Sequence, residues 1–367
     1  MRIVIISRCI FPSIAPRPFR ATELAKYFAK QGHDVTLIAS LGKYDYSSFE
    51  SNTGIRVLSL GPMLFSTMNS DDYFRNTIFD RIARRLLGRA FEFPDIELMW
   101  RVKKSITQLT NVDLLITIAI PYPIHWGAAL ARKKRPSLFP RIWISDCGDP
   151  YMGNSVGKKH PFYFRYLENF WGEMTDYITI PIEASRCAYS EAVQDKIRVI
   201  PQGFDFSNVE LDSNYQEGDV IRFAYAGATY PGYRDPTKLL DYLVKLKNKE
   251  FEFTIYTKAK ELFNNYKALL GDKLVLKSYI PREKLLYELS QMDFLINLTN
   301  GSAVQSPSKL IDYYLTHRPI IDVSSSFTER DVFDEFMNRN FIHKHINVDI
   351  SQYDINNVGK QFIDLAQ

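Results

Sequence analysis

Ser306, Pro307, Ser308, Lys309 and Asp312 have types and spacing suited to binding a phosphate-bearing ligand. They follow a predicted buried strand and a polar loop. Ser306 is a good N-cap, and Pro307 suits the first helical turn. Free N–H groups at a helix start favour an anion, and Lys309 adds a full positive charge. Asp312 shares a helical face with Lys309, where it could hold a ribose diol. A plain capped helix with a solvated ion pair accounts for the same residues about as well.

The loop after the predicted strand 220–227 is a second candidate phosphate site. Gly227 permits close approach of the backbone to a ligand, and Thr229 and Tyr230 follow it. Arg234 stands at the mouth of the loop, where bidentate binding of phosphate is natural. A lone arginine on a tight loop is more often a surface residue. Function is favoured because two strand-to-helix loops of one domain each carry a cation.

The turn Tyr279, Ile280 and Pro281 joins a predicted strand to a helix. Its backbone groups could bind a nucleotide base. Alone, such a turn is only a strand–helix joint.

The first half of the chain carries a looser set of polar residues just after predicted strands: Arg17, Arg20, His125, Asp146 and Asp149. Asp146 and Asp149 follow a strand end directly, although an aspartate before a proline can equally be a turn cap. A single histidine near a helix start is more often structural or solvated.

The elements that position these residues begin with a strand–helix–strand unit. The run 3–6 is short and wholly apolar, as in a strand buried on both faces. The stretch 8–17 is rich in Pro and Ser and predicts a loop. A helical apolar face follows over 19–30, Gly32 ends that helix, and 35–39 is the next strand. This order predicts a parallel sheet covered by helices.

Further strands are expected in two series: 55–60, 113–120, 140–146, 177–182 and 197–201, then 220–227, 251–257, 273–277, 292–298 and 318–323. Helical stretches lie between most of them. This predicts an α/β protein with two Rossmann-like, doubly wound parallel sheets. We expect domains at 1–204 and 220–345, joined by a polar linker at 205–219. The segment 346–367 could pack back towards the first domain.

The motifs occur in an order that resembles retaining GT-B glycosyltransferases of family 4, of the bacterial polysaccharide and cell-surface glycan type. The matching stretches cover nearly the whole chain: 11–12, 20–25, 32–35, 144–151, 198–205, 227–236, 279–285, 307–315 and 318–321. The resemblance implies two domains facing a central cleft. It also implies transfer of a sugar from a nucleotide diphosphate carrier, of UDP or GDP type, to a glycan or lipid-linked saccharide in surface polysaccharide biosynthesis.

The resemblance also implies a role for each matching residue of the second domain. Arg234 and Lys309, with the amides near Ser306 and Ser308, would neutralise the diphosphate, and Asp312 would hold the ribose. Gly227, Thr229 and Tyr230 would lie beside the donor, and the turn at 279–281 would hold the base.

In the first domain, the resemblance implies an acceptor site. Asp146 and Asp149 would lie near the reacting sugar, and Arg17, Arg20 and His125 are the acceptor-side candidates. Retention would use a same-face route that needs no side-chain nucleophile. No DxD cluster is present, so we expect neither a metal nor another cofactor.

Departures from the family pattern concern the sugar more than the fold. Many members carry a glutamate at the position of Val304, and most carry one at the position of Asp312. Arg234 also lies later in its loop than the usual basic residue. These differences leave the donor sugar open.

Composition narrows the setting. The chain has 367 residues, a formal net charge of +4 and three scattered cysteines, without a nucleic-acid reading motif. No run approaches the roughly 18 apolar residues of a membrane span. We expect a cytoplasmic protein, at most peripheral to the membrane. The basic, aromatic stretch 74–104 could contact an anionic membrane, although a helix that covers the domain is the slightly favoured alternative.

Three other functions fit the sequence less well. A non-catalytic GT-B-like subunit that binds a nucleotide or a partner would explain Val304. A sugar-nucleotide epimerase would need an acid/base set that the sequence does not reveal. A dinucleotide oxidoreductase is disfavoured because neither first strand-to-helix loop, 7–18 or 227–234, contains GxGxxG.

Overall fold

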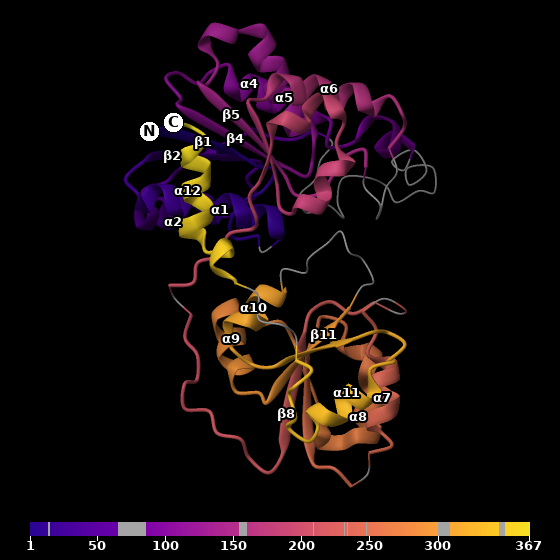
Figure 1. Cartoon of the computed structure of the whole chain (residues 1–367). Coiled ribbons are helices and arrows are strands. Elements are labelled where there is room, and N and C mark those ends of the chain that lie inside the picture. The colour runs from indigo at the N-terminus through magenta and orange to yellow at the C-terminus, as the bar shows by residue number, and fades with distance from the viewer. Residues whose placement is uncertain are drawn as a thin grey trace. The chain divides into compact units, whose positions relative to one another are not determined.

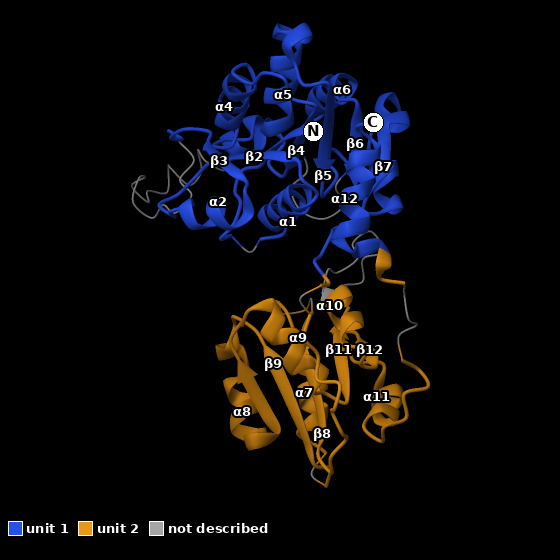
Figure 2. Ribbon diagram, turned by 90° about the vertical axis from the view of Figure 1, so that its left-hand side faces the viewer, with its two compact units in different colours: residues 1–205, 352–367 blue, residues 206–351 orange. Residues whose placement is uncertain are grey.

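The chain folds into two compact units, each with its own parallel sheet and core (Figures 1 and 2). The first comprises Met1–Asp205 and Gln352–Gln367, and the second comprises Phe206–Ser351. No helix among the described residues is long and apolar enough to cross a membrane. The computed structural model describes residues 1–13, 15–64, 86–153, 160–207, 209–230, 232, 234–246, 248–299, 309–344 and 349–367, with Lys309 described by its backbone only.

The first unit contains a seven-stranded parallel sheet of order β3-β2-β1-β4-β5-β6-β7. The predicted strands of the first half are all present: β1 (Arg2–Ile6), β2 (Asp34–Ala39), β3 (Arg56–Ser59), β4 (Leu114–Ala119), β5 (Ile142–Cys147), β6 (Tyr177–Ile180) and β7 (Ile197–Val199). Alternate residues of each central strand face opposite layers, as in β1, where Ile3 and Ile5 belong to one core cluster and Val4 and Ile6 to the other.

Helices cover both faces of this sheet. The cluster with Ile3 is completed by α1 (Pro16–Lys30), α2 (Ser47–Thr53) and α12 (Ile355–Asp364). The cluster with Val4 is completed by α4 (Glu97–Ile106), α5 (Pro123–Lys134) and α6 (Phe164–Met174). Helix α1 begins earlier than the sequence predicts. The sequence predicts a loop over 8–17 and a helix from residue 19, but Pro16 and Pro18 lie in the first turn of α1. Proline is tolerated there because its missing N–H would have no intrahelical acceptor.

The C-terminal helix α12 packs against α1 in the first unit (Figure 1, yellow beside indigo). Before it, the amide of Phe204 bonds to the carbonyl of Tyr353 at 2.8 Å, and the amide of Ile355 bonds to the carbonyl of Phe204 at 2.9 Å. The chain therefore enters the second unit and returns at nearly the same place.

The second unit contains a five-stranded parallel sheet of order β10-β9-β8-β11-β12, and all strands predicted for it are present. Helices lie on both of its faces. The strands are β8 (Ile221–Ala226), β9 (Phe251–Tyr256), β10 (Leu274–Lys277), β11 (Phe294–Leu298) and β12 (Ile320–Val323). The helices are α7 (Thr237–Leu243), α8 (Asn264–Leu270), α9 (Arg282–Ser290), α10 (Lys309–Leu315) and α11 (Arg330–Phe336).

In the segment predicted as a linker, 205–219, the described residues form no helix or strand, and some of them bond to the second unit. The amide of Asp212 donates to the hydroxyl of Ser290 at 2.8 Å, and the hydroxyl of Tyr215 donates to Asp293 at 3.2 Å.

Candidate functional site

Arg20 and Asp146 form a buried ion pair at the carboxyl end of β5. Nε and Nη2 of Arg20 donate to the two oxygens of Asp146, each at 2.7 Å. Nη1 donates to the carbonyl of Pro201 at 2.6 Å, and the hydroxyl of Thr179 donates to Asp146 at 2.6 Å. The structure therefore brings together two predicted site residues, with both carboxylate oxygens engaged and both residues at most 3% exposed.

Arg17 adds a second positive charge at this strand end. Burial raises the pKa of Asp146, but Arg20 and Arg17 lower it and the net shift is downward. The guanidinium of Arg17 lies over Gly148, where a Cβ would be only 1.6 Å from its central carbon. The half-buried Asp149 follows, and its carbonyl accepts a 2.5 Å hydrogen bond from a tyrosine hydroxyl. This end of the sheet is cationic, polar and held by specific contacts.

His125 lies in the core of the first unit, which agrees with the structural interpretation. Nδ1 is 2.8 Å from the hydroxyl of Thr117, and Nε2 is 3.5 Å from the thiol of Cys147. Complete burial lowers the pKa of His125 to about 3, so the ring is neutral at pH 7. It has no exposed surface to offer an acceptor.

An aromatic pair, Phe11 and Tyr44, is exposed in the loops that follow β1 and β2. The two rings are 5.5 Å apart and nearly perpendicular, at 89°. Phe11 stacks on the buried Phe49, and its backbone is held by Thr22 at 3.0 Å and Tyr46 at 2.6 Å. Both rings are more than a third exposed. The Phe11 and Tyr44 rings are therefore held in place by other residues of the protein.

In the second unit, the loop after β8 is held in place by hydrogen bonds within it. One carboxylate oxygen of Asp235 accepts from the amide of Gly232 at 2.9 Å, and the other accepts from the amide of Thr237 at 3.0 Å. The hydroxyl of Thr229 is buried and makes no hydrogen bond to any residue that the structure describes. A buried hydroxyl of this kind can donate to a ligand oxygen.

Arg234, Tyr230 and Tyr279 come together at the carboxyl ends of β8 and β10. Burial raises the pKa of Tyr225 at the end of β8, and Arg234 lies near enough to lower it. Tyr279 and Tyr230 lie near enough to raise it, and burial together with Tyr230 raises the pKa of Tyr279. The ammonium of Lys258, just after β9, lies 5.5 Å from the centre of the Tyr279 ring. Two cations and two exposed tyrosines therefore share one edge of the sheet.

Asp312 on α10 pairs with Arg282, the first residue of α9. Nε of Arg282 donates to Asp312 at 2.8 Å, and both side chains are about four-fifths buried. Burial raises the pKa of Asp312 although Arg282 opposes the rise. The next residue, Tyr313, accepts a hydrogen bond from the amide of Ala226 at 2.8 Å, which ties α10 to the end of β8.

Three predicted residues lie outside the described part of the chain, and a fourth, Lys309, is described by its backbone only. Ser306 and Ser308 lie outside the described residues, as does Val304. Lys309 is the first residue of α10, three positions before Asp312.

Comparisons with known proteins rest on structure alone, because no family model and no curated protein sequence matches the chain. A glycosyltransferase from Rickettsia africae matches with a TM-score of 0.63 and 14% identity, over 100% of this chain and 98% of that one. A mutant of TarM from Staphylococcus aureus matches with 0.59 and 9%, over 100% of both chains. The lipopolysaccharide outer core galactosyltransferase WaaB matches with 0.58 and 13%, over 100% and 99%.

The chain has the GT-B fold. The fold predicted from the sequence is thereby confirmed. A UDP-GlcNAc 2-epimerase from Neisseria meningitidis also matches, with a TM-score of 0.54 and 10% identity, over 100% of this chain and 99% of that one. The GT-B fold therefore does not choose between transfer and epimerisation, and the residues must decide.

Sequence reasoning missed three features of this GT-B chain. Lys258 follows the predicted strand 251–257 directly, so the rule that directed attention to strand ends could have found it. Tyr44 lies further from its strand and gave no signal. The pairing of Arg282 with Asp312 joins the starts of two helices and had no counterpart in local spacing.

Proposed function

We propose that this protein is a glycosyltransferase that moves a sugar from a nucleotide diphosphate donor to a glycan or lipid-linked saccharide. The observation that carries the proposal is the grouping of Arg234, Lys258, Tyr230 and Tyr279 at the carboxyl edge of the second sheet. Ligands of such sheets bind at this edge. The cations suit a diphosphate, and the exposed tyrosine rings suit a planar base.

The chemistry required of the second unit is stabilisation of a leaving group. Negative charge accumulates on the diphosphate as the bond to the sugar breaks, and cations placed there lower the barrier. Arg234 and Lys309, aided by Lys258, would supply this charge without a metal. The Asp312–Arg282 pair lies at the start of two helices, where the carboxylate could accept from the ribose hydroxyls. Retention of configuration follows from the family resemblance.

The first unit would bind the acceptor. The perpendicular rings of Phe11 and Tyr44 offer apolar faces of the kind on which the C–H side of a pyranose ring packs. Arg17 and Asp149 lie at the end of β5 in the same sheet and could bind hydroxyl groups. The buried Asp146 would act by fixing Arg20 and the strand end. A saccharide acceptor fits this combination of exposed rings and polar groups, and surface polysaccharide biosynthesis is the setting that the resemblance implies.

We also propose that the first unit touches the cytoplasmic face of an anionic membrane. Leu86, Phe91, Phe162 and Tyr166 are exposed, and the segments that carry them are joined by a 2.7 Å hydrogen bond from Tyr163 to the carbonyl at position 90. The exposed Arg89 and Arg165 lie on the same segments. Exposed aromatic groups beside cations suit an anionic bilayer. Residues 74–85 of the predicted membrane-contact stretch 74–104 lie outside the described residues.

A non-catalytic nucleotide-binding subunit remains the second candidate, supported by Val304. The two candidates share the donor site and differ in turnover, so binding and transfer must be measured separately.

The decisive experiment is a thermal-shift panel of UDP, GDP, ADP and their sugars, followed by transfer assays with the sugar that binds. Arg234→Ala and Lys309→Ala should each lower transfer at least about tenfold, because each removes a positive charge that would stabilise the leaving diphosphate. Arg222→Ala is the matched control, since Arg222 is exposed at the opposite end of β8. Tyr44→Ala should weaken the binding of the acceptor and leave the thermal shift caused by the nucleotide unchanged. A chelator should not abolish transfer.

Near wild-type turnover in both cation variants would overturn the assignment. A nucleotide shift without hydrolysis or transfer would support the non-catalytic subunit.

A further inference from the structure

Glu168 is a buried carboxyl group that the proposed reaction does not use. It lies on α6 between Phe164 and Trp171, and the spacing of these three residues places them on one helical face. The residue is only 1% exposed. It forms no ion pair in the described part of the chain. A carboxyl group buried without a cation is unusual enough to need a reason.

Glu168 lies between two loops at the carboxyl edge of the first sheet. Its Oε1 accepts from the backbone amide of Met152, in the loop after β5, at 3.4 Å. The backbone amide of Ser190, between the 3₁₀ turns Glu183–Ala188 and Glu191–Lys196 that follow β6, lies near enough to lower the pKa of Glu168. The hydroxyl of Ser190 donates to Asn169, the next residue of α6, at 2.6 Å. Adjacent residues of α6 thus contact both loops.

The loop after β5 is the one that carries Asp149. The hydroxyl of Tyr122 donates to the carbonyl of Asp149 at 2.5 Å, and its ring stacks on Tyr151 at 4.3 Å. Movement of the loop near Glu168 would therefore be transmitted to Asp149.

The groups around Glu168 leave its charge almost uncompensated. Among the described residues, the exposed Arg165 on the same helix is the one cation that lowers the pKa of Glu168. Tyr122, Tyr189 and Cys147 face it from the loops and from β5 and stay neutral, since burial raises the pKa of each. Tyr151 is also neutral, because burial raises its pKa, and it lies beside the pair formed by Glu92 and His160, whose atoms are 3.2 Å apart.

We propose that Glu168 is a positioning residue: its neutral carboxyl holds the loops after β5 and β6 together, and its ionisation loosens both. The proposal goes beyond sugar transfer and needs no bound donor. It adds a control on the loop that carries Asp149.

The direction of the effect follows from linkage. Burial raises the pKa of Glu168 to about 7, although the amides of Met152 and Ser190 and the charge of Arg165 oppose the rise. A glutamate in water titrates near about 4.3. Conformations that expose Glu168 therefore gain stability, relative to the closed one, as the pH rises through the pKa of the closed state.

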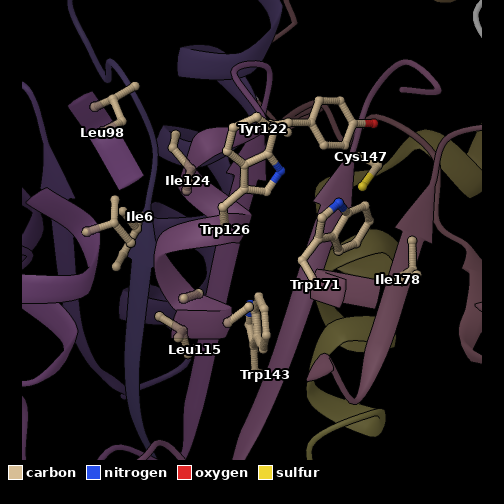
Figure 3. Close-up of a cluster of buried hydrophobic side chains, with 14 of the residues drawn as sticks. Ile6, Leu98, Leu115, Tyr122, Ile124, Trp126, Trp143, Cys147, Trp171 and Ile178 are labelled. Carbon is tan, nitrogen blue, oxygen red and sulfur yellow. The ribbon is translucent and has the colours of Figure 1, made fainter. Parts of the chain in front are cut away.

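Two tryptophans can report on this change. Trp126 and Trp171 lie in the same buried cluster as Tyr122 and Cys147 (Figure 3). Neither indole N–H has a hydrogen-bond partner among the described residues. Opening of the loops would expose these rings to water and change their emission.

The test is a pH titration of tryptophan emission on the whole chain, from about pH 5.5 to 8.5, with hydrogen-exchange protection factors at both ends. We expect a transition near pH 7 in the wild type and lower protection of residues 148–153 and 188–192 at high pH. Glu168→Gln, which mimics the neutral form, should abolish both. Glu173→Gln, on the exposed side of α6, and His160→Gln are the matched controls and should keep them.

A wild type without the transition would overturn the proposal, as would a Glu168→Gln variant that keeps it. Loss of the transition in His160→Gln alone would assign it to the histidine instead. If Glu168→Gln does not fold, the location of the exchange difference in the wild type decides. None of these readouts involves a nucleotide, so failure here leaves the proposed transfer reaction untouched.

Discussion

At the scale of single residues, the clearest result is that Arg20 and Asp146 form an ion pair with each other. Sequence spacing presents them as independent candidates 126 positions apart, one for the acceptor and one for the sugar. The fold makes them a bidentate pair with nearly no exposed surface. A buried pair of this type is costly to break, because either partner alone would leave an unpaired charge inside the protein.

Arg20→Met should therefore lower the free energy of unfolding by about 3–5 kcal/mol, because Asp146 keeps its burial and loses its cation. Urea denaturation of the whole chain measures the change. Lys26→Met is the matched control on the same helix. Lys26 pairs with Glu23 at the surface, and such a pair contributes only about 0–1 kcal/mol.

The pH dependence of this loss has a definite sign. Because the folded-state pKa of Asp146 lies below its usual value, its stabilising effect is present above the unfolded pKa and is lost as the pH falls through the folded one. The difference between wild type and Arg20→Met should thus be full at neutral pH and shrink in acid. An equal difference at all pH values would contradict the ion-pair explanation.

At the scale of elements, the contact between α12 and α1 depends on one glycine. A Cβ at Gly359 would lie 2.1 Å from the ring of Tyr27, so the two helices approach more closely than an alanine permits. Val358 and Phe362 on α12 complete the apolar core beneath α1, and Phe362 also lies 5.4 Å from the guanidinium of Arg20. The C-terminal helix is therefore part of the support for the buried ion pair.

Gly359→Ala should destabilise the first unit by about 1–3 kcal/mol, since overpacking forces neighbouring side chains to move. Thermal unfolding measures it, with the exposed Lys360→Ala as the control. Adding Tyr27→Ala should recover part of the loss. If Gly359→Ala matches wild type, the helices have more freedom to separate than the contact suggests.

At the scale of the whole molecule, each unit has its own core, and each presents a candidate binding edge of its own. The first unit also carries the exposed surface that we assign to a membrane. That surface includes Phe162 and Tyr166, which are 79% and 71% exposed. The spacing of the basic stretch 74–104 did not indicate these residues. In the described part of that stretch, α4 turns Leu98, Val102 and Ile106 into the core, as the helix-covering alternative expects, whereas Trp100 is 57% exposed.

The whole protein should float with vesicles that contain anionic lipid and not with purely zwitterionic ones, because both exposed rings and cations are required. The double change Phe162→Ser and Tyr166→Ser should reduce the bound fraction severalfold. Leu269→Ser removes a similarly exposed apolar residue from α8 and should have no effect. Equal flotation of both variants would exclude this surface.

The sequence alone determined the two series of parallel strands and the edge of each sheet where ligands are expected. Buried strands are short apolar runs, and helices show a period of about 3.6 residues, so both are local patterns. For the same reason Arg234 and Tyr279 could be selected from their places just after strands. The predicted start of α1 was wrong, because Pro16 and Pro18 are more typical of a loop than of a helix.

Only the tertiary structure decided which candidates meet and which are already occupied. Arg20 pairs with Asp146, Asp312 pairs with Arg282, and His125 is buried in the core. None of these contacts follows from spacing along the chain. The demand to neutralise or hydrogen-bond a buried polar group is met by whichever partner the fold brings near, and that partner can be more than a hundred residues away. For Glu168, no described residue supplies a paired cation, and burial raises its pKa to about 7.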